Sequence, residues 1–206
     1  MKRIIISLLV AVVALIGTTG ANAQFRYGAT AGVEISSLKF KQDLFDVDQN
    51  VGFSAGVLGE LMFPGVGFGI DFGLQYTMLG ATMNLGQKPM WADQGYGKEK
   101  SQLHYVMVPI HLRFKYTRLN GLEDYIAPFV YAGPSFGFLA GHSKLECMDY
   151  AGGDLGVDFG IGAELATHWQ ISASYRMGMT YALKAKVLTD FSARNNSWSV
   201  KVSYLF

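Results

Sequence analysis

The stretch that decides the fold is Val66–Met78, which reads VGFGIDFGLQYTM. Its even positions, from Phe68 to Met78, are all large and apolar, whereas the odd positions from Gly67 to Thr77 are Gly, Asp, Gln or Thr. A period of two residues places the two sets on opposite faces of one β-strand. The segment is therefore predicted to be a strand with one large apolar face and one small, polar face.

The same alternation recurs and predicts seven more strands, at residues 27–36, 51–63, 103–116, 125–139, 155–165, 169–180 and 197–206. Segment 125–139 is apolar at both parities, so its faces stay unassigned. Pro109, Pro128 and Pro134 interrupt a regular hydrogen-bonded ladder, and we expect β-bulges to accommodate them.

The connections between these strands alternate in length. Long polar segments at 37–50, 79–102, 140–154 and 182–196 alternate with short links at 64–65, 117–124 and 166–168. Large extracellular loops at one rim and short periplasmic turns at the other are typical of a membrane barrel. The chain is therefore predicted to be all-β, an eight-stranded antiparallel transmembrane β-barrel.

The N-terminus carries an export pattern. Basic Lys2 and Arg3 precede an apolar run from Ile4 to Ile16, and a small-residue site ends at Ala23. The run is too short to span a bilayer as a helix and matches a secretory signal peptide. We expect residues 1–23 to be this signal peptide, residues 24–206 to form the barrel domain, and Sec-type export to deliver it to the outer membrane.

A lipocalin would share the strand count and the alternation, but its apolar face would point inward. Two observations favour an apolar exterior in contact with outer-membrane lipid, and the first is that aromatic residues gather near the strand ends as candidate membrane girdles. They are Tyr27, Phe63, Phe68, Tyr116, Trp169, Tyr204 and Phe206 at the short-turn rim, and Phe53, Tyr76, Tyr181 and Trp198 at the long-loop rim. Aromatic residues also favour strands in general, so this alternative stays open.

The second observation is a near balance of charge on the small, polar face. Its members form a predicted barrel-interior charge network: Glu34, Glu60, Asp71, Arg113, Lys115, Asp158, Glu164, Arg176 and Lys201. An eight-stranded barrel is filled by side chains, and opposite charges enclosed there need to pair. A hairpin centred at Gly65 and Val66 puts Glu60 opposite Asp71, so we expect Arg113 or Arg176 to bridge these two acids. An ordinary solvated face of mixed charge is the alternative.

Other chemistry is sparse. Loss of Lys2 and Arg3 leaves 15 of the 17 bases against 16 acids, which disfavours nucleic acid as a partner. Cys147 is the single cysteine, the histidines lack metal-ligand spacing, and we expect no metal and no cofactor.

Some polar residues near the predicted loop rim could belong to an enzyme, although polar loops supply such residues by chance. They are Asp93, His104, His142, Ser143 and Asp149. The longest loop carries Lys88, Trp91, Tyr96 and Lys100 and is a candidate binding surface, with an unpartnered solvated loop as the alternative.

Three segments carry a family resemblance: residues 105–112 (YVMVPIHL), 128–137 (PFVYAGPSFG) and 202–206 (VSYLF). They resemble the outer-membrane β-barrel domain proteins of Bacteroidota, a group that includes PorT-like proteins. The resemblance covers essentially the whole mature chain and implies an eight-stranded outer-membrane barrel. Terminal Phe206 is similar to the aromatic signal read by the outer-membrane insertion machinery, which makes that machinery an expected partner.

The sequence thus predicts an outer-membrane protein that acts as a structural scaffold for displayed loops, with adhesion or accessory work in secretion as open roles. It is not expected to be a general porin, because about eight strands leave no aqueous channel once the inward side chains are placed. It is not expected to be an enzyme, because polar loops supply the candidate rim residues by chance. An enzyme with its site at the loop rim and a soluble lipocalin-like carrier are the alternatives.

Overall fold

The computed structural model describes residues 24–40, 47–63, 67–84, 98–116, 125–143, 148–185 and 192–206. The expected signal peptide lies outside these ranges. Eight long strands make up most of the described chain: β1 (Gln24–Phe40), β2 (Val47–Met62), β3 (Phe68–Asn84), β4 (Lys98–Lys115), β5 (Ile126–His142), β7 (Gly153–Leu165), β8 (Trp169–Gly178) and β10 (Ser192–Leu205). Two three-residue strands, β6 (Met148–Tyr150) and β9 (Leu183–Ala185), complete the sheet. Within the described ranges, no helix has the length and apolar character needed to cross a membrane.

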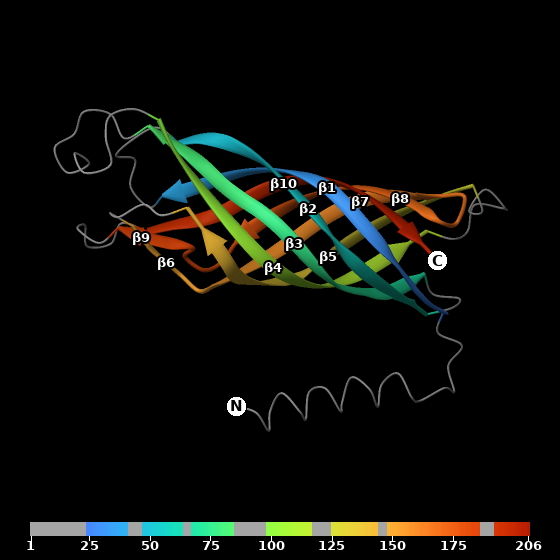
Figure 1. Cartoon of the computed structure of the whole chain (residues 1–206). Helices are drawn as coiled ribbons and strands as arrows, with labels where there is room; N and C mark the ends of the chain where they lie inside the picture. Colours follow the sequence, from blue (N-terminus) through green and yellow to red (C-terminus); the bar gives the residue numbers. More distant parts are fainter. Residues whose placement is uncertain are drawn as a thin grey trace, which may run out of the picture.

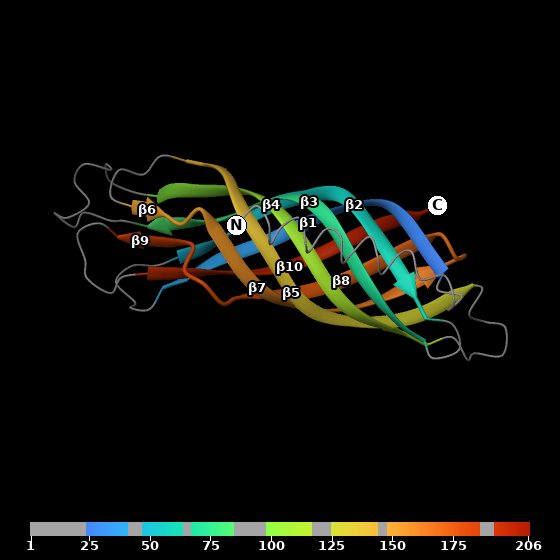
Figure 2. The same cartoon turned by 90° about the horizontal axis from the view of Figure 1, so that it is seen from below.

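The sheet closes on itself. The long strands follow one another in chain order, each antiparallel to its neighbour, and β10 pairs back with β1 from Gly28↔Leu205 to Phe40↔Ala193. Figures 1 and 2 show the strands inclined around one cylinder, with β1 and β10 side by side. The predicted all-β, eight-stranded antiparallel barrel is confirmed. The predicted contrast in loop length involves segments outside the described residues and stays a prediction.

We name the two ends of the barrel by their connections. At the turn end, β2 connects to β3, β4 to β5, and β7 to β8, and the C-terminus lies there as well. The other end is the loop end. The β7–β8 turn is described in full, and its Ala166 and Thr167 both take positive φ values, 48° and 62°.

Strand alternation separates an apolar outer face from a small, polar inner face. On β3, Phe72 is 40% exposed while Asp71 and Gln75 are buried, and on β10 Val200 is 57% exposed while Ser199 is buried. A lipocalin-like arrangement would place Phe72 and Val200 along a central cavity. Their exposure shows that the apolar face is the outside of the barrel.

Strand β5, whose faces the sequence left open, is apolar on both sides for a reason visible across the β5–β7 ladder. Its outward side chains include Val130, whereas Phe129 and Tyr131 are buried. Tyr131 pairs with Gly160, where a Cβ atom would lie 2.2 Å from Cζ of the tyrosine ring. The inward aromatic ring therefore occupies the space that the glycine leaves free.

The bulges expected at the prolines are not found. The register of β4 and β5 runs unshifted past Pro109, Pro128 and Pro134. The β3–β4 ladder instead pauses next to Pro109, between Phe72↔Ile110 and Gln75↔Met107, as the missing N–H of proline requires. Register shifts occur between Gln49 and Ser54 and between His104 and Tyr105, towards the loop end.

Aromatic side chains contact one another on the outer face near both ends. At the turn end, Tyr204 packs against Trp169 at 4.9 Å and against Phe206 at 5.1 Å between ring centroids, and Phe206 also contacts Tyr27 at 5.6 Å. Nearer the loop end, the ring of Tyr175 lies 4.8 Å from that of Trp198. These contacts form two outward aromatic zones with aliphatic side chains between them.

An apolar core fills the barrel at its loop end. Its buried members come from β1, β3, β4, β9 and β10 and from the residues beside them: Leu38, Leu79, Ala81, Leu103, Tyr105, Met107, Ala182, Leu183 and Ala193. Strand β9 contributes because it pairs with the start of β10, and β6 pairs with β9 beyond it. The inner face therefore changes from charged to apolar along the barrel axis.

Candidate functional site: the charged barrel interior

Glu60 is at the centre of the ionic cluster nearest the turn end. Its side chain, on β2, is 0% exposed. The carboxylate accepts hydrogen bonds from Arg113 Nη1 at 2.5 Å, from Lys115 Nζ at 3.0 Å and from Gln170 Nε2 at 2.8 Å. Arg26 Nη2 is a fourth donor to it. These donors come from β1, β4 and β8, so Glu60 links strands across the lumen as well as along the wall.

Glu164 on β7 is the second acid of this cluster. It accepts hydrogen bonds from Arg26 Nη2 at 2.6 Å, from Lys115 Nζ at 2.7 Å and from Gln170 Nε2 at 2.9 Å. Three donors are therefore shared between Glu60 and Glu164. Such shared contacts fix both carboxylates and avoid the cost of leaving a buried ion unpaired.

Arg113 bridges the two acids that face each other across the β2–β3 hairpin. Glu60 and Asp71 are register partners, and their like charges would repel. Arg113 donates from Nε to Asp71 Oδ2 at 2.6 Å and from Nη1 to Glu60 Oε2 at 2.5 Å, while its guanidinium carbon lies 4.1 Å from the ring centroid of Phe129. Arg176, the other expected candidate, belongs to a separate cluster. The turn-end cluster thus pairs the acids Glu60, Asp71 and Glu164 with the bases Arg26, Arg113 and Lys115.

Asp158 on β7 is at the centre of the second cluster, midway along the barrel. It accepts a hydrogen bond from Ser135 Oγ at 2.9 Å and lies 3.1 Å from Nε2 of His111. Arg176 donates to Ser135 Oγ at 2.5 Å and to Asp154 Oδ2 at 3.1 Å, and its Nη1 is 3.9 Å from Asp158. The cluster therefore joins β4, β5, β7 and β8.

A looser contact lies on the other side of the interior. Lys201 on β10 donates to Gln75 Oε1 at 3.0 Å and lies 3.6 Å from Glu34 Oε1. Glu34 is buried, and among the described residues its ion pair is with this one distant base. The nine interior residues singled out in the sequence thus fall into two tight clusters and one weak pair.

Sequence reasoning missed several participants. Arg26 precedes the expected first strand, yet it shares the inward parity of Gly28, Thr30 and Glu34, and that parity could have identified it. Asp154 falls in the segment 140–154 that the sequence predicts to be a loop, and Gln170, inside the predicted strand 169–180, carries no charge that would single it out. The alternation of polar and apolar residues did not predict the apolar core. On the inward side of β4, where polar residues are expected, Leu103, Tyr105 and Met107 are apolar or aromatic.

The candidate enzyme residues whose side chains the structure describes, His104, His142 and Ser143, each have contacts of their own. Tyr76 Oη lies 2.6 Å from His104 Nδ1, the ring of His142 stacks on Tyr150 at 4.0 Å, and Ser143 Oγ accepts from Gln102 N at 2.8 Å. Asp93, Cys147 and the candidate loop residues Lys88, Trp91 and Tyr96 lie outside the described residues. Within the described ranges, no three His, Cys, Asp or Glu side chains are grouped as a metal site would require.

The family of the chain follows from a match to a family model. The model for the outer membrane protein beta-barrel domain matches residues 20–184. The chain belongs to that family. It is therefore an outer-membrane barrel, and the exposed apolar band described above lies in a lipid environment.

Solved structures with a similar chain path are outer-membrane proteins at low sequence identity. Ail of Yersinia pestis, solved with the heparin analogue sucrose octasulfate, is 16% identical over 89% of this chain and 99% of its own, with a TM-score of 0.44. OprG of Pseudomonas aeruginosa is 12% identical over 88% and 94%, with a TM-score of 0.49. The outer membrane enzyme PagL is 10% identical over 84% and 97%, with a TM-score of 0.40. Comparison with curated proteins gave no match.

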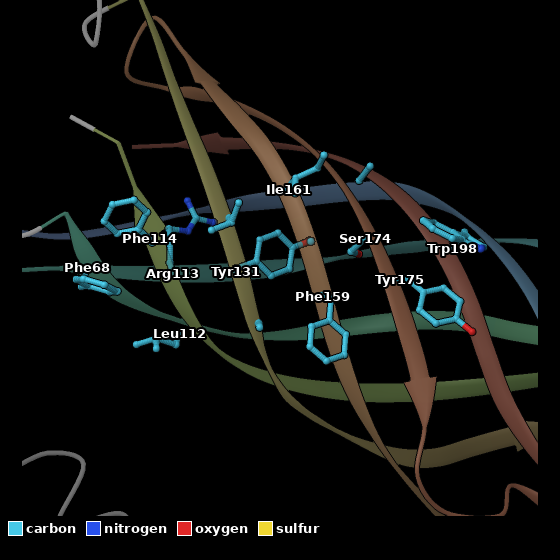
Figure 3. Close-up of a pocket in the computed structure, with 14 residues that line it drawn as sticks. Phe68, Leu112, Arg113, Phe114, Tyr131, Phe159, Ile161, Ser174, Tyr175 and Trp198 are labelled. Atoms are coloured by element: carbon cyan, nitrogen blue, oxygen red, sulfur yellow. The ribbon is translucent and has the colours of Figure 1, made fainter. Parts of the chain in front are cut away.

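A hollow of about 670 Å³ interrupts the lipid-facing wall of this outer-membrane barrel, mainly over β4, β5, β7 and β8, with Phe68 of β3 and Trp198 of β10 also lining it. Figure 3 shows side chains that line it, among them Leu112, Phe159 and Trp198. Most lining side chains are exposed and apolar, whereas Arg113 is buried and belongs to the turn-end cluster. The hollow is thus a feature of the outer, lipid-facing surface.

Proposed function

We propose that the protein is a closed, non-conducting barrel that acts as a structural scaffold for the loops at its loop end. The observation that carries this proposal is the filling of the interior by ionic contacts between strands that are not neighbours in the wall. Arg26 on β1 and Lys115 on β4 both reach Glu164 on β7, and Gln170 on β8 reaches Glu60 on β2. Side chains that meet across the lumen occupy the space that a channel would need.

The apolar core supports the same proposal from the loop end. Leu79, Leu103 and Leu183 are 0% exposed and come from three different strands. An ion entering from that end would have to leave water and pass an apolar layer before it met the charged clusters. That passage is costly for any ion.

Conductance in planar bilayers tests the closed lumen. The refolded mature protein is expected to give no discrete current steps at any voltage that the membrane tolerates. Bilayers that receive detergent alone provide the baseline. Stepwise currents whose size changes in the double variant Glu60→Gln/Arg113→Gln would show that ions pass through the interior, and would overturn the proposal.

Loop display has a separate test. Replacing residues 85–97 by a short Gly-Ser turn is expected to leave a heat-modifiable, membrane-inserted barrel and to remove adhesion of expressing cells to host-type surfaces. Unchanged adhesion would refute the adhesive role of this loop. A fall in export of other proteins would instead support the secretion-accessory role suggested by the resemblance to PorT-like proteins.

Alanine substitution at Asp93, His104 and His142 tests the enzyme alternative, which requires an activity that depends on them.

The route to the membrane is also part of the proposal. We infer Sec-type export, cleavage after Ala23 and recognition of Phe206 by the insertion machinery. N-terminal sequencing of the outer-membrane form is expected to begin at Gln24, and Phe206→Ser is expected to slow assembly. A first residue other than Gln24 would refute the cleavage site.

A further inference from the structure

A second hollow, of about 330 Å³, opens on the outer face towards the loop end and carries the charge pattern of an anion site. It is lined by Lys39, Met177, Gly178, Tyr181, Ser192, Arg194 and Asn196. Among the residues that the structure describes, the lining contains two bases and no acid. We propose that this hollow binds a phosphate group of an anionic outer-leaflet lipid headgroup.

The hollow exists because β10 changes partner at this point. β10 pairs with β8 up to Asn196↔Met177 and with β9 from Ala193↔Leu183. Arg194 and Asn195 therefore stand opposite the longer segment 178–182, which cannot pair with them residue by residue. The extra chain departs from the regular ladder and leaves a recess in the outer wall.

The two bases are placed where their charges oppose each other. Lys39 on β1 and Arg194 on β10 are direct register partners, and both side chains are exposed on the outer face. Like charges directly opposite on neighbouring strands destabilise a sheet. An anion between them reverses the sign of that interaction, and a phosphate also suits the planar donor fork of arginine.

Other groups in the recess suit the same ligand. Asn196 Oδ1 accepts a hydrogen bond from Gly178 N at 3.1 Å, which leaves the amide NH₂ of Asn196 as the donor end of that side chain. The Arg194 guanidinium carbon lies 5.0 Å from the ring centroid of Tyr181, and this contact holds the guanidinium at the recess. An arginine, a lysine and an amide thus line the hollow.

The height of the recess on the barrel points to a lipid as the source of the phosphate. Along the outward positions of β10, exposed Val202, Val200 and Trp198 are followed by Asn196 and Arg194. Arg194 lies about 13 Å along the strand beyond Trp198 at a rise of ~3.3 Å per residue. The polar headgroup layer begins at such an aromatic belt. The bases therefore lie at the level of headgroups rather than in the apolar band.

The test measures lipid retention by native mass spectrometry of the mature protein released from mixed micelles. The probes are a diphosphorylated glycolipid, the same glycolipid without its phosphates, and inorganic phosphate alone. Wild-type protein is expected to retain the phosphorylated form at least about tenfold better than the other two, which corresponds to ~1.4 kcal/mol. Equal retention of the dephosphorylated lipid, or equally tight binding of inorganic phosphate, would overturn the assignment to a headgroup phosphate.

Variants tie the binding to the recess. Arg194→Gln and Lys39→Gln are each expected to lower retention, Arg194→Glu to abolish it, and Arg194→Lys to keep part of it. Lys100→Gln removes an exposed base at the same end of the barrel, on β4, and serves as the matched control. All variants are compared only after they show the heat-modifiable mobility of the folded barrel. Retention by Arg194→Gln equal to that of wild type would overturn the site.

The effect of Arg194→Gln on the urea midpoint provides a second readout, because it should change sign when the phosphorylated lipid is present. In phosphate-free detergent, Arg194→Gln removes the repulsion with Lys39 and is expected to raise the urea midpoint or leave it unchanged. In micelles that contain the phosphorylated glycolipid, the same substitution is expected to lower the midpoint, because a bound ligand stabilises the folded wild type. A lower midpoint in both media would show a merely structural role for Arg194 and refute the proposal.

Discussion

Glu60→Gln is the substitution that most directly probes the interior of the barrel. It preserves side-chain shape but changes the turn-end cluster from three acids and three bases to two acids and three bases. The new amide would also point an NH₂ donor at a site where Arg26, Arg113, Lys115 and Gln170 already donate. Removing one partner from a buried ionic group costs about 3–5 kcal/mol, so we expect Glu60→Gln to lower the free energy of unfolding by that amount.

The assay is a reversible urea titration of the barrel refolded in detergent micelles, followed by tryptophan fluorescence and by heat-modifiable gel mobility. Glu34→Gln is the matched control, because Glu34 is also buried but, among the described residues, pairs with one base, Lys201, at 3.6 Å. The stability lost in Glu34→Gln is expected to be clearly smaller than that lost in Glu60→Gln. The double variant Glu60→Gln/Lys115→Met restores charge balance and is expected to recover about 0.5–3 kcal/mol relative to additivity.

Two results would refute this reasoning. One is a loss for Glu60→Gln below about 1 kcal/mol, which is the range of ordinary exposed ion pairs. The other is strict additivity of the Glu60 and Lys115 substitutions, which would mean that these groups do not interact in the folded barrel.

Two further predictions concern the wall. Val200→Arg places a cation on the lipid face, and we expect a loss of about 2–4 kcal/mol in lipid vesicles if the site is near the bilayer midplane, against a small change for Val200→Ala; equal losses for the two would contradict the lipid contact. Gly160→Ala puts a Cβ 2.2 Å from the Tyr131 ring and is expected to cost about 1–3 kcal/mol by overpacking. At Gly152 an added Cβ meets nothing within 4 Å, so Gly152→Ala is the control, and Tyr131→Ala is expected to relieve the Gly160→Ala strain; a Gly160→Ala variant as stable as Gly152→Ala would contradict the packing described.

Much of the fold could be predicted because the barrel wall imposes one local rule. Each residue of β3 from Phe68 to Thr77 faces either lipid or lumen, so hydropathy alternates with the backbone and can be read locally. The opposition of Glu60 and Asp71 followed from the same rule together with a tight turn. The need for a bridging base then followed from electrostatics alone.

What could not be predicted depends on contacts between distant strands. Tyr131 is inward only because Gly160, on the next strand of the wall, leaves room for its ring. Leu103 and Leu79 face inward because the loop end of the interior is apolar, and no local period distinguishes that end from the charged middle. The recess at Arg194 likewise results from a change of strand partner, which alternation does not encode.

The pairing of Gly28 with Leu205 sets a condition on the order of assembly. The barrel is closed by β1 and β10, which are far apart in the sequence, and the amide of Phe206 donates to the carbonyl of Tyr27 at 2.8 Å. Until β10 pairs with β1, both strands carry an unpaired backbone edge, and such edges invite aggregation. Truncation that removes most of β10 would leave the barrel open, because β10 supplies every pair of the ladder that closes it onto β1.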